Sequence, residues 1–181
     1  MTYMLKDILQ DRIGMEEIRV ICSECIGRPN DSAKEELFGL IYDSDDRIAY
    51  NALWIFTHFP AAEIQWLSTK RDEFIDLLMS ATHVGKRRLL LTLLDRLPVE
   101  KDQVRQDYLD FCLSAINSTE PYGIRALCMK QAFAQSRFYP ELLHELELEL
   151  EMTQYGELSP GITSARKNIM KRIAALRPDI P

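Results

Sequence analysis

Cys22 and Cys25 form a C-x-x-C motif, a spacing that can bind a metal or carry redox chemistry. A structural zinc site needs four ligands, and the remaining cysteines, Cys112 and Cys128, do not supply a second closely spaced pair. A redox-active C-x-x-C motif begins a helix that follows a strand, and no strand pattern precedes these residues. Both cysteines instead continue an apolar helical stripe that begins at Met15. We therefore predict that they are buried and reduced.

Histidine and carboxylate clusters are the next candidates for acid–base or metal chemistry. His144 follows Glu141 at the Glu-x-x-His spacing, but a di-iron helical bundle needs two such pairs and two further glutamates. Residues 43–46 resemble the start of a calcium loop without its glycine and distal glutamate, so they better fit a helix cap with Ser44 as the N-cap residue. Phosphate-binding glycine loops, zincin motifs and nucleophile elbows are absent from the sequence. We predict no catalytic residue, no metal site and no cofactor.

Basic side chains give the one positive indication of a binding site. The net charge is −6, yet lysines and arginines concentrate near 85–97, 121–136 and 161–177, and the segments between these three are acidic. If the three basic segments share one face of the fold, that face could attract an anionic partner. Lys167 and Lys171 are spaced i, i+4 opposite an apolar stripe and should point to solvent. The candidate binding residues are Lys86, Arg87, Arg88, Lys130, Lys167 and Lys171.

Three interpretations of this charge pattern remain open. The first is that the charges have no binding role. Solvated helix faces must carry charge, and pairs of opposite charge on neighbouring helices would each contribute only about 0–1 kcal/mol to stability. The basic segments could instead bind nucleic acid, or an acidic segment of another protein. A sequence pI near 5.2 counts against nucleic acid, since most proteins that bind it are basic overall.

The elements that would position these residues are all helical, because apolar residues recur at helical spacing and strand alternation is nearly absent. Residues 145–151 do alternate glutamate and leucine, but Leu142, Leu146 and Leu150 keep a helical stripe there. The first helices of the expected pairs lie near 3–11, 32–43, 62–82, 101–117 and 139–153. The helix near 62–82 is expected to break near Ser68. The second helices lie near 15–27, 45–58, 85–97, 121–136 and 161–177.

Length and composition fit one soluble domain that spans residues 1–181. No apolar run reaches the length that a membrane span requires. Residues 1–11 contain acidic residues and no apolar core, so we expect no signal peptide and a cytoplasmic location.

The second helices repeat a pattern about every 38 residues, in which a basic residue is followed by an apolar run. The segment Asp46 to Leu53 is the clearest example. This pattern resembles the HEAT-repeat branch of the armadillo-type superfamily over residues 30–177. The resemblance implies an α-α superhelix of about four antiparallel hairpins, preceded by a lead-in helical pair in residues 1–29.

Families with this architecture are mostly scaffolds and adaptors, so the resemblance implies a non-catalytic, intracellular protein–protein interaction module. One related branch, the HEAT-like DNA alkylation-repair glycosylases, binds DNA on a basic concave face, and nucleic-acid binding is therefore the alternative. A glycosylase would need an unpaired carboxylate, such as Asp46 or Asp95, beside an exposed aromatic residue such as Trp54. We expect Trp54 and Trp66 to lie in the core.

Overall fold

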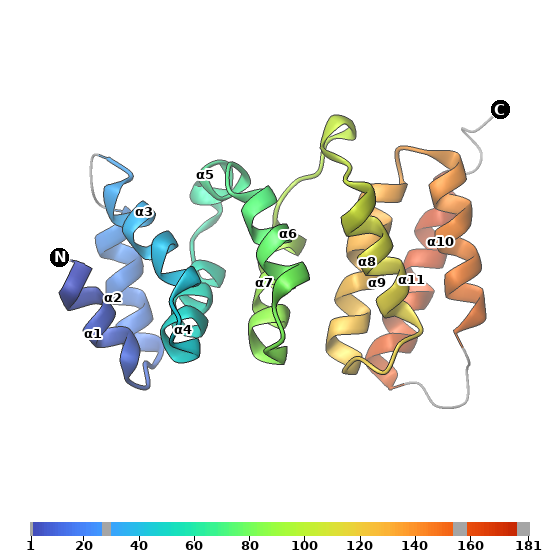
Figure 1. Cartoon of the computed structure of the whole chain (residues 1–181). Coiled ribbons are helices and arrows are strands. Elements are labelled where there is room, and N and C mark those ends of the chain that lie inside the picture. The colour runs from blue at the N-terminus through green and yellow to red at the C-terminus, as the bar shows by residue number, and fades with distance from the viewer. Residues whose placement is uncertain (1, 27–29, 154–158, 177–181) are drawn as a thin grey trace.

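The computed structural model of the chain is a curved row of helices (Figure 1) and describes residues 2–26, 30–153 and 159–176. Within these ranges it contains eleven α-helices, three short 3-10 helices and no strand. The all-α prediction is therefore confirmed.

The helices form consecutive pairs. The first elements of the five pairs are α1 (Thr2–Gln10), α3 (Ser32–Gly39) with η1 (Leu40–Tyr42), η2 (Ala61–Glu63) with α5 (Ile64–Ser68) and α6 (Arg71–Ser80), η3 (Lys101–Gln103) with α8 (Gln106–Ile116), and α10 (Pro140–Met152). The second helices are α2 (Met15–Ile26), α4 (Asp46–Thr57), α7 (Val84–Arg96), α9 (Tyr122–Ser136) and α11 (Pro160–Leu176).

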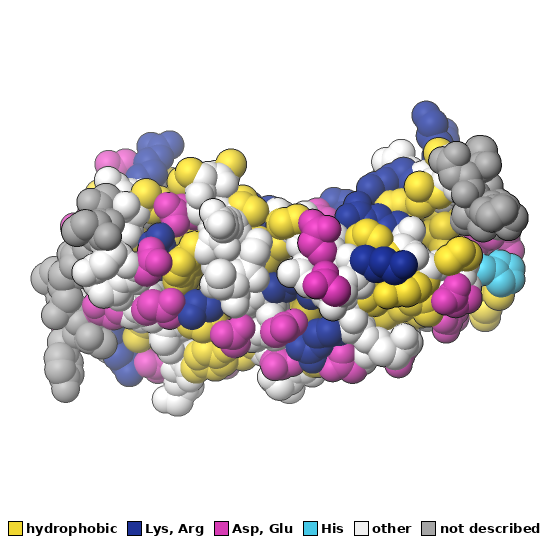
Figure 2. Space-filling model, turned by 90° about the horizontal axis from the view of Figure 1, so that it is seen from above, with side chains coloured by type: hydrophobic (Ala, Val, Ile, Leu, Met, Phe, Trp, Pro, Cys, Tyr) yellow, Lys and Arg dark blue, Asp and Glu magenta, His cyan; other side chains and the backbone are white. Residues whose placement is uncertain are grey.

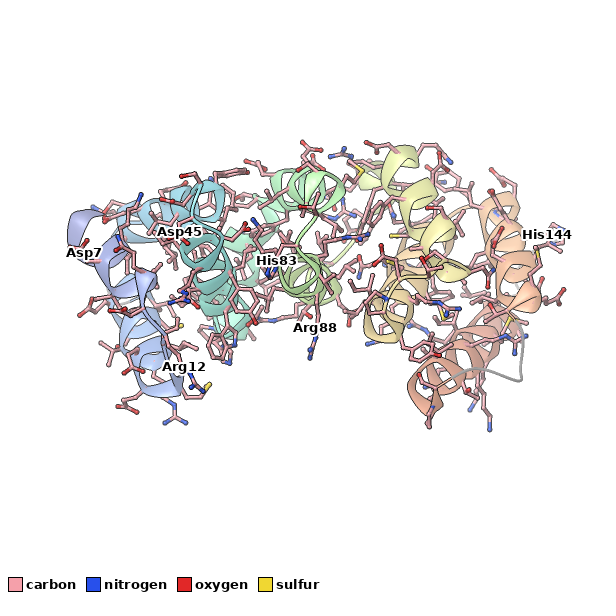
Figure 3. All side chains as sticks on the ribbon, turned by 60° about the horizontal axis from the view of Figure 1, so that its bottom comes forward. Asp7, Arg12, Asp45, His83, Arg88 and His144 are labelled. Atoms are coloured by element: carbon pink, nitrogen blue, oxygen red, sulfur yellow. The ribbon has the colours of Figure 1, made fainter. Side chains whose placement is uncertain are left out.

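The second helices stack on one another in chain order, from α2 through α4, α7 and α9 to α11. Contacts between the first helices α6, α8 and α10 are much less extensive. Because the second helices approach each other more closely, the row curves toward them, and they line its concave side (Figure 3).

The core runs along the whole row between the two layers. Phe56, Phe59, Phe74 and Tyr108 are almost completely buried there, and leucines 90, 91, 93 and 94 of α7 are buried as well. Burial of one such side chain contributes about 1.5–3 kcal/mol, so each pair depends on its neighbours for most of its stability. In α10, Leu143, Leu146 and Leu150 are buried, which confirms that the alternating Glu-Leu segment is helical.

Two details of the helix boundaries refine the sequence analysis. The helix expected near 62–82 does divide, with α5 ending at Ser68 and α6 beginning at Arg71. The prediction that Ser44 caps α4 is wrong, because the N-cap residue is Asp45, whose Oδ1 accepts a hydrogen bond of 2.8 Å from the Arg47 backbone N–H. The Asp43 carboxylate accepts a hydrogen bond from the backbone N–H of Asp45. The cap is therefore one residue later than predicted.

Candidate interaction surface

Several arginines of the second helices bond to the carbonyl groups at the C-terminal ends of other helices. Arg96, in the last turn of α7, donates hydrogen bonds to the carbonyl oxygens of Phe56, Thr57 and Phe59 at the end of α4. Arg137, directly after α9, donates to the Val99 carbonyl at 3.0 Å. The helix dipole favours a cation at the C-terminal end of α4, where the last carbonyls have no further helical turn to bond to. Val99 lies in the segment between α7 and η3.

Arg125 and Arg166 act in the same way within their own helix pairs. The Arg125 Nε donates to the carbonyl of Ile116, the last residue of α8. The Arg166 Nε donates to the carbonyl of Leu150 in the last turn of α10. Part of the basic charge on the second helices is therefore used to join helices to one another.

Three of the six predicted binding residues form ion pairs between consecutive pairs of helices. Lys86 lies 2.6 Å from the Asp46 carboxylate, and Lys130 lies 3.1 Å from the Asp95 carboxylate. Arg87 pairs with Glu120 and covers the ring of Phe111. The hydrogen bond from Lys86, followed by its positive charge, lowers the pKa of Asp46.

The other three predicted residues, Arg88, Lys167 and Lys171, are exposed and form no ion pair with a described residue. Arg88 projects from α7 into the hollow between the two ends of the molecule (Figure 3). Lys167 and Lys171 lie on α11, away from its buried residues Ile162, Ile169 and Ile173. The predicted exposure of these two lysines is thus confirmed.

The C-terminal half of the concave side is strongly biased toward positive charge. Neither α9 nor α11 contains an aspartate or a glutamate, and α7 contains only Asp95. Viewed from above, lysine and arginine side chains gather along the hollowed edge in the half of the molecule that holds these helices (Figure 2). We name this area, formed by the exposed sides of α7, α9 and α11, the basic concave surface.

A cavity of about 440 Å³ opens on this surface between the end of α7 and the helices α9 and α11. Its polar lining comes from Asp95, Lys130, Gln131, Arg137, Asn168 and Arg172. Arg137 and Arg172 are not among the six predicted residues. The sequence did hold a signal for them, since Arg172 lies in the basic segment 161–177 and Arg137 directly follows the basic segment 121–136.

The N-terminal half of the concave side is aromatic instead. The rings of Tyr50 and Trp54 on α4 lie 6.4 Å apart, and Tyr50 also contacts His83, the N-cap residue of α7. Trp54 is half-buried and packs against the core. Asp46 and Asp95, the two carboxylates considered for a glycosylase, are both paired with lysines. The combination of an unpaired carboxylate and an exposed Trp54 is therefore not found.

The cysteines behave as apolar core residues. Cys22, Cys25, Cys112 and Cys128 are all buried and free, as expected, and burial raises the pKa of Cys22 to about 11. The described residues contain no group of three or more histidine, cysteine, aspartate or glutamate side chains that could hold a metal ion. His144 is exposed and lies 3.7 Å from Glu147.

None of the helices in the described ranges is both long enough and apolar enough to cross a membrane.

Antiparallel helix pairs stacked into a row, with their second helices along a hollowed side, define this protein as an α-solenoid. The family model described as "HEAT repeat domain" matches residues 5–173, and the chain belongs to this family. Comparison with curated proteins and with solved structures finds no match in either set.

Proposed function

We propose that this protein is a non-catalytic, intracellular interaction module of a single HEAT-repeat domain, which binds an acidic segment of a partner protein on its basic concave surface. The proposal needs no cofactor and places the protein in the cytoplasm. HEAT repeats commonly mediate protein interactions, which supports the general role. The specific role is supported by one observation above all, the complete lack of acidic residues in α9 and α11.

The partner's acidic residues would first contact the cations that have no ion pair with a described residue. Arg88, Lys167 and Lys171 meet this condition. Lys86, Arg87 and Lys130 would add positive potential while keeping their existing partners. Such complementarity increases the association rate and orients the partner more than it increases affinity.

Nucleic acid is the second candidate, since a basic concave surface beside aromatic side chains could also hold phosphates. The overall charge of −6 and the ion pairs of Asp46 and Asp95 favour the protein partner. A nucleic-acid complex that uses about five phosphates would lose affinity with a log–log salt slope near −4.5.

Affinity capture from native cytosol, analysed by mass spectrometry, tests the proposal. The informative variant is Lys167→Glu with Lys171→Glu, because these side chains are exposed and their replacement breaks no ion pair with a described residue. Changing Lys86 or Arg87 would also remove an ion pair between helices, and a loss of binding would then be ambiguous.

The control is Arg12→Glu with Arg19→Glu, which makes the same change in charge on exposed residues at the N-terminal end. It removes one exposed ion pair, between Arg19 and Glu16 at 3.7 Å, and such a pair contributes only about 0–1 kcal/mol. We expect a specific protein to be lost with the lysine variant and retained with the control. Equal capture by both variants, or capture of nucleic acid alone, would contradict the proposal.

A further inference from the structure

The cavity on the basic concave surface has two guanidinium groups with no matching carboxylate among the described residues. It is lined from α9 and its C-terminal end by Lys130 and Arg137, from α11 by Asn168 and Arg172, and from the end of α7 by Asp95. Asp95 is its only acidic lining residue. Because Asp95 pairs with Lys130 at 3.1 Å, the charges of Arg137 and Arg172 remain uncompensated.

Both arginines are exposed, and each guanidinium group lies over an aromatic ring. The Arg172 guanidinium carbon lies 4.2 Å from the centre of the Phe133 ring, and that of Arg137 lies 4.6 Å from the Phe138 ring. Arg137 is further fixed by its hydrogen bond to the Val99 carbonyl. A guanidinium that lies over a ring keeps N–H donors for a ligand. These contacts restrict both side chains, and that of Arg137 more strongly, before any ligand arrives.

The charge and donors of this cavity fit a phosphate monoester better than a carboxylate. A phosphate monoester carries a charge of about −1.5 to −2 at pH 7 and three strong acceptor oxygens. It can therefore neutralise two arginines and accept a hydrogen-bond pair from each planar guanidinium. A carboxylate brings one charge and two oxygens, so it would leave one arginine without a counterion.

We propose that this cavity binds a phosphorylated serine or threonine side chain of the partner segment. This inference rests on the proposed function and makes it more specific. Lys167 and Lys171 adjoin Asn168 and Arg172 along α11, so acidic residues beside the phosphorylated residue would reach them. The volume of about 440 Å³ leaves space for the residue that carries the phosphate as well as for the phosphate itself.

Fluorescence polarisation with three labelled peptides tests this inference. The peptides share one acidic sequence and carry serine, glutamate or phosphoserine at the central position. We expect the phosphoserine peptide to bind on the order of tenfold more tightly than the glutamate peptide, because phosphate brings more negative charge and a third acceptor oxygen to the two arginines. Inorganic phosphate at millimolar concentration should compete with the phosphoserine peptide and leave the glutamate peptide bound.

Two variants locate the effect. Arg172→Lys keeps the charge but loses the planar, two-pronged donor, so it should reduce the preference for phosphoserine over glutamate to about twofold or less. Asn168→Asp places a carboxylate in the cavity from an exposed position, and it should weaken the phosphoserine peptide more than the serine peptide. Asn168→Asp also serves as the test if the Arg172→Lys variant does not fold.

The outcomes separate this inference from the proposed function. Equal affinity for the phosphoserine and glutamate peptides, or an unchanged preference in both variants, would overturn the phosphate site and leave the acidic-segment proposal intact. If none of the three peptides binds wild-type protein at low salt, the phosphate site and the acidic-segment proposal both fail. Binding of inorganic phosphate alone, without a gain for the phosphoserine peptide, would assign the cavity to free phosphate and overturn the inference.

Discussion

The guanidinium group of Arg96 donates a hydrogen bond of 2.7 Å to the carbonyl oxygen of Thr57, the last residue of α4. The two residues belong to consecutive helix pairs, so this bond joins one repeat to the next. The same guanidinium also donates to the carbonyls of Phe56 and Phe59, so one side chain bonds to three backbone acceptors. This explains why an arginine in the last turn of a second helix stabilises a solenoid irrespective of any partner.

Replacing Arg96 by methionine should lower the free energy of unfolding by about 1.5–3 kcal/mol, because bonds from a charged donor to half-buried carbonyls are lost. Arg88→Met on the same helix should change it by less than about 0.5 kcal/mol, since Arg88 is exposed. Urea denaturation of the two variants checks this. Equal effects would show that the contacts of Arg96 do not join the repeats.

The ion pair between Lys86 and Asp46 should make stability depend on pH. The hydrogen bond from Lys86 lowers the pKa of Asp46 in the folded state. A carboxyl group of this kind stabilises the fold above its unfolded-state pKa of about 4, and the contribution is lost as the pH falls through the folded-state value. The difference in thermal midpoint between wild type and Asp46→Asn should therefore be positive at pH 7 and shrink as the pH is lowered toward 3.

A double-mutant cycle controls for other effects of the Asp46 substitution. In a Lys86→Met background, the pH-dependent difference caused by Asp46→Asn should be much smaller, because only the weaker attraction of His83 remains to lower the pKa of Asp46. If the difference keeps its full size without the lysine, the pH dependence does not come from this pair.

Two glycines at the same position of successive second helices should respond differently to alanine. A Cβ at Gly123, the second residue of α9, would meet nothing within 4 Å, whereas a Cβ at Gly85, the second residue of α7, would lie 2.9 Å from ring atoms of Tyr50 and His83. Gly123→Ala should therefore stabilise the protein by about 0.4–1 kcal/mol, because alanine lowers the conformational entropy of the unfolded chain. Gly85→Ala must displace two rings and should gain less, as measured by urea denaturation. An equal gain at both positions would contradict this geometry.

The four cysteines should not react with iodoacetamide in the folded protein near pH 7.5. All four are buried, and burial raises the pKa of Cys22 to about 11, so little of the reactive thiolate forms. Mass spectrometry should show no modification before unfolding and four modifications in denaturant. Rapid labelling of Cys22 or Cys25 in the native state would contradict their assignment to the core.

The helical layout could be predicted from the sequence because apolar spacing is a local property that each helix displays by itself. The segment 145–151 illustrates this, since its leucines fit a helix despite the alternating glutamates, and α10 is helical there. Helix ends are set by individual hydrogen bonds, and the choice between Ser44 and Asp45 as N-cap depended on which side chain reaches the Arg47 backbone N–H.

The candidate site was harder to predict, because the role of each basic residue depends on its distant neighbours. Lys86 and Lys167 look alike in sequence, yet Lys86 reaches Asp46 on the preceding second helix and Lys167 forms no ion pair with a described residue. Arg137 and Arg172 are brought to one cavity by the stacking of α9 on α11. Such neighbours are fixed by tertiary packing, and the spacing of charges within one helix carries no information about it.

Binding of a labelled glutamate-rich peptide, followed by fluorescence polarisation at two salt concentrations, tests the central claim most directly. Wild-type protein should bind the peptide at low salt and release it as salt screens the basic concave surface. Lys167→Glu with Lys171→Glu should weaken binding by about tenfold or more, because two attractive contacts become repulsive, while Arg12→Glu with Arg19→Glu should bind like wild type. Equal affinity of the two double variants, or no binding by wild-type protein at low salt, would contradict the account.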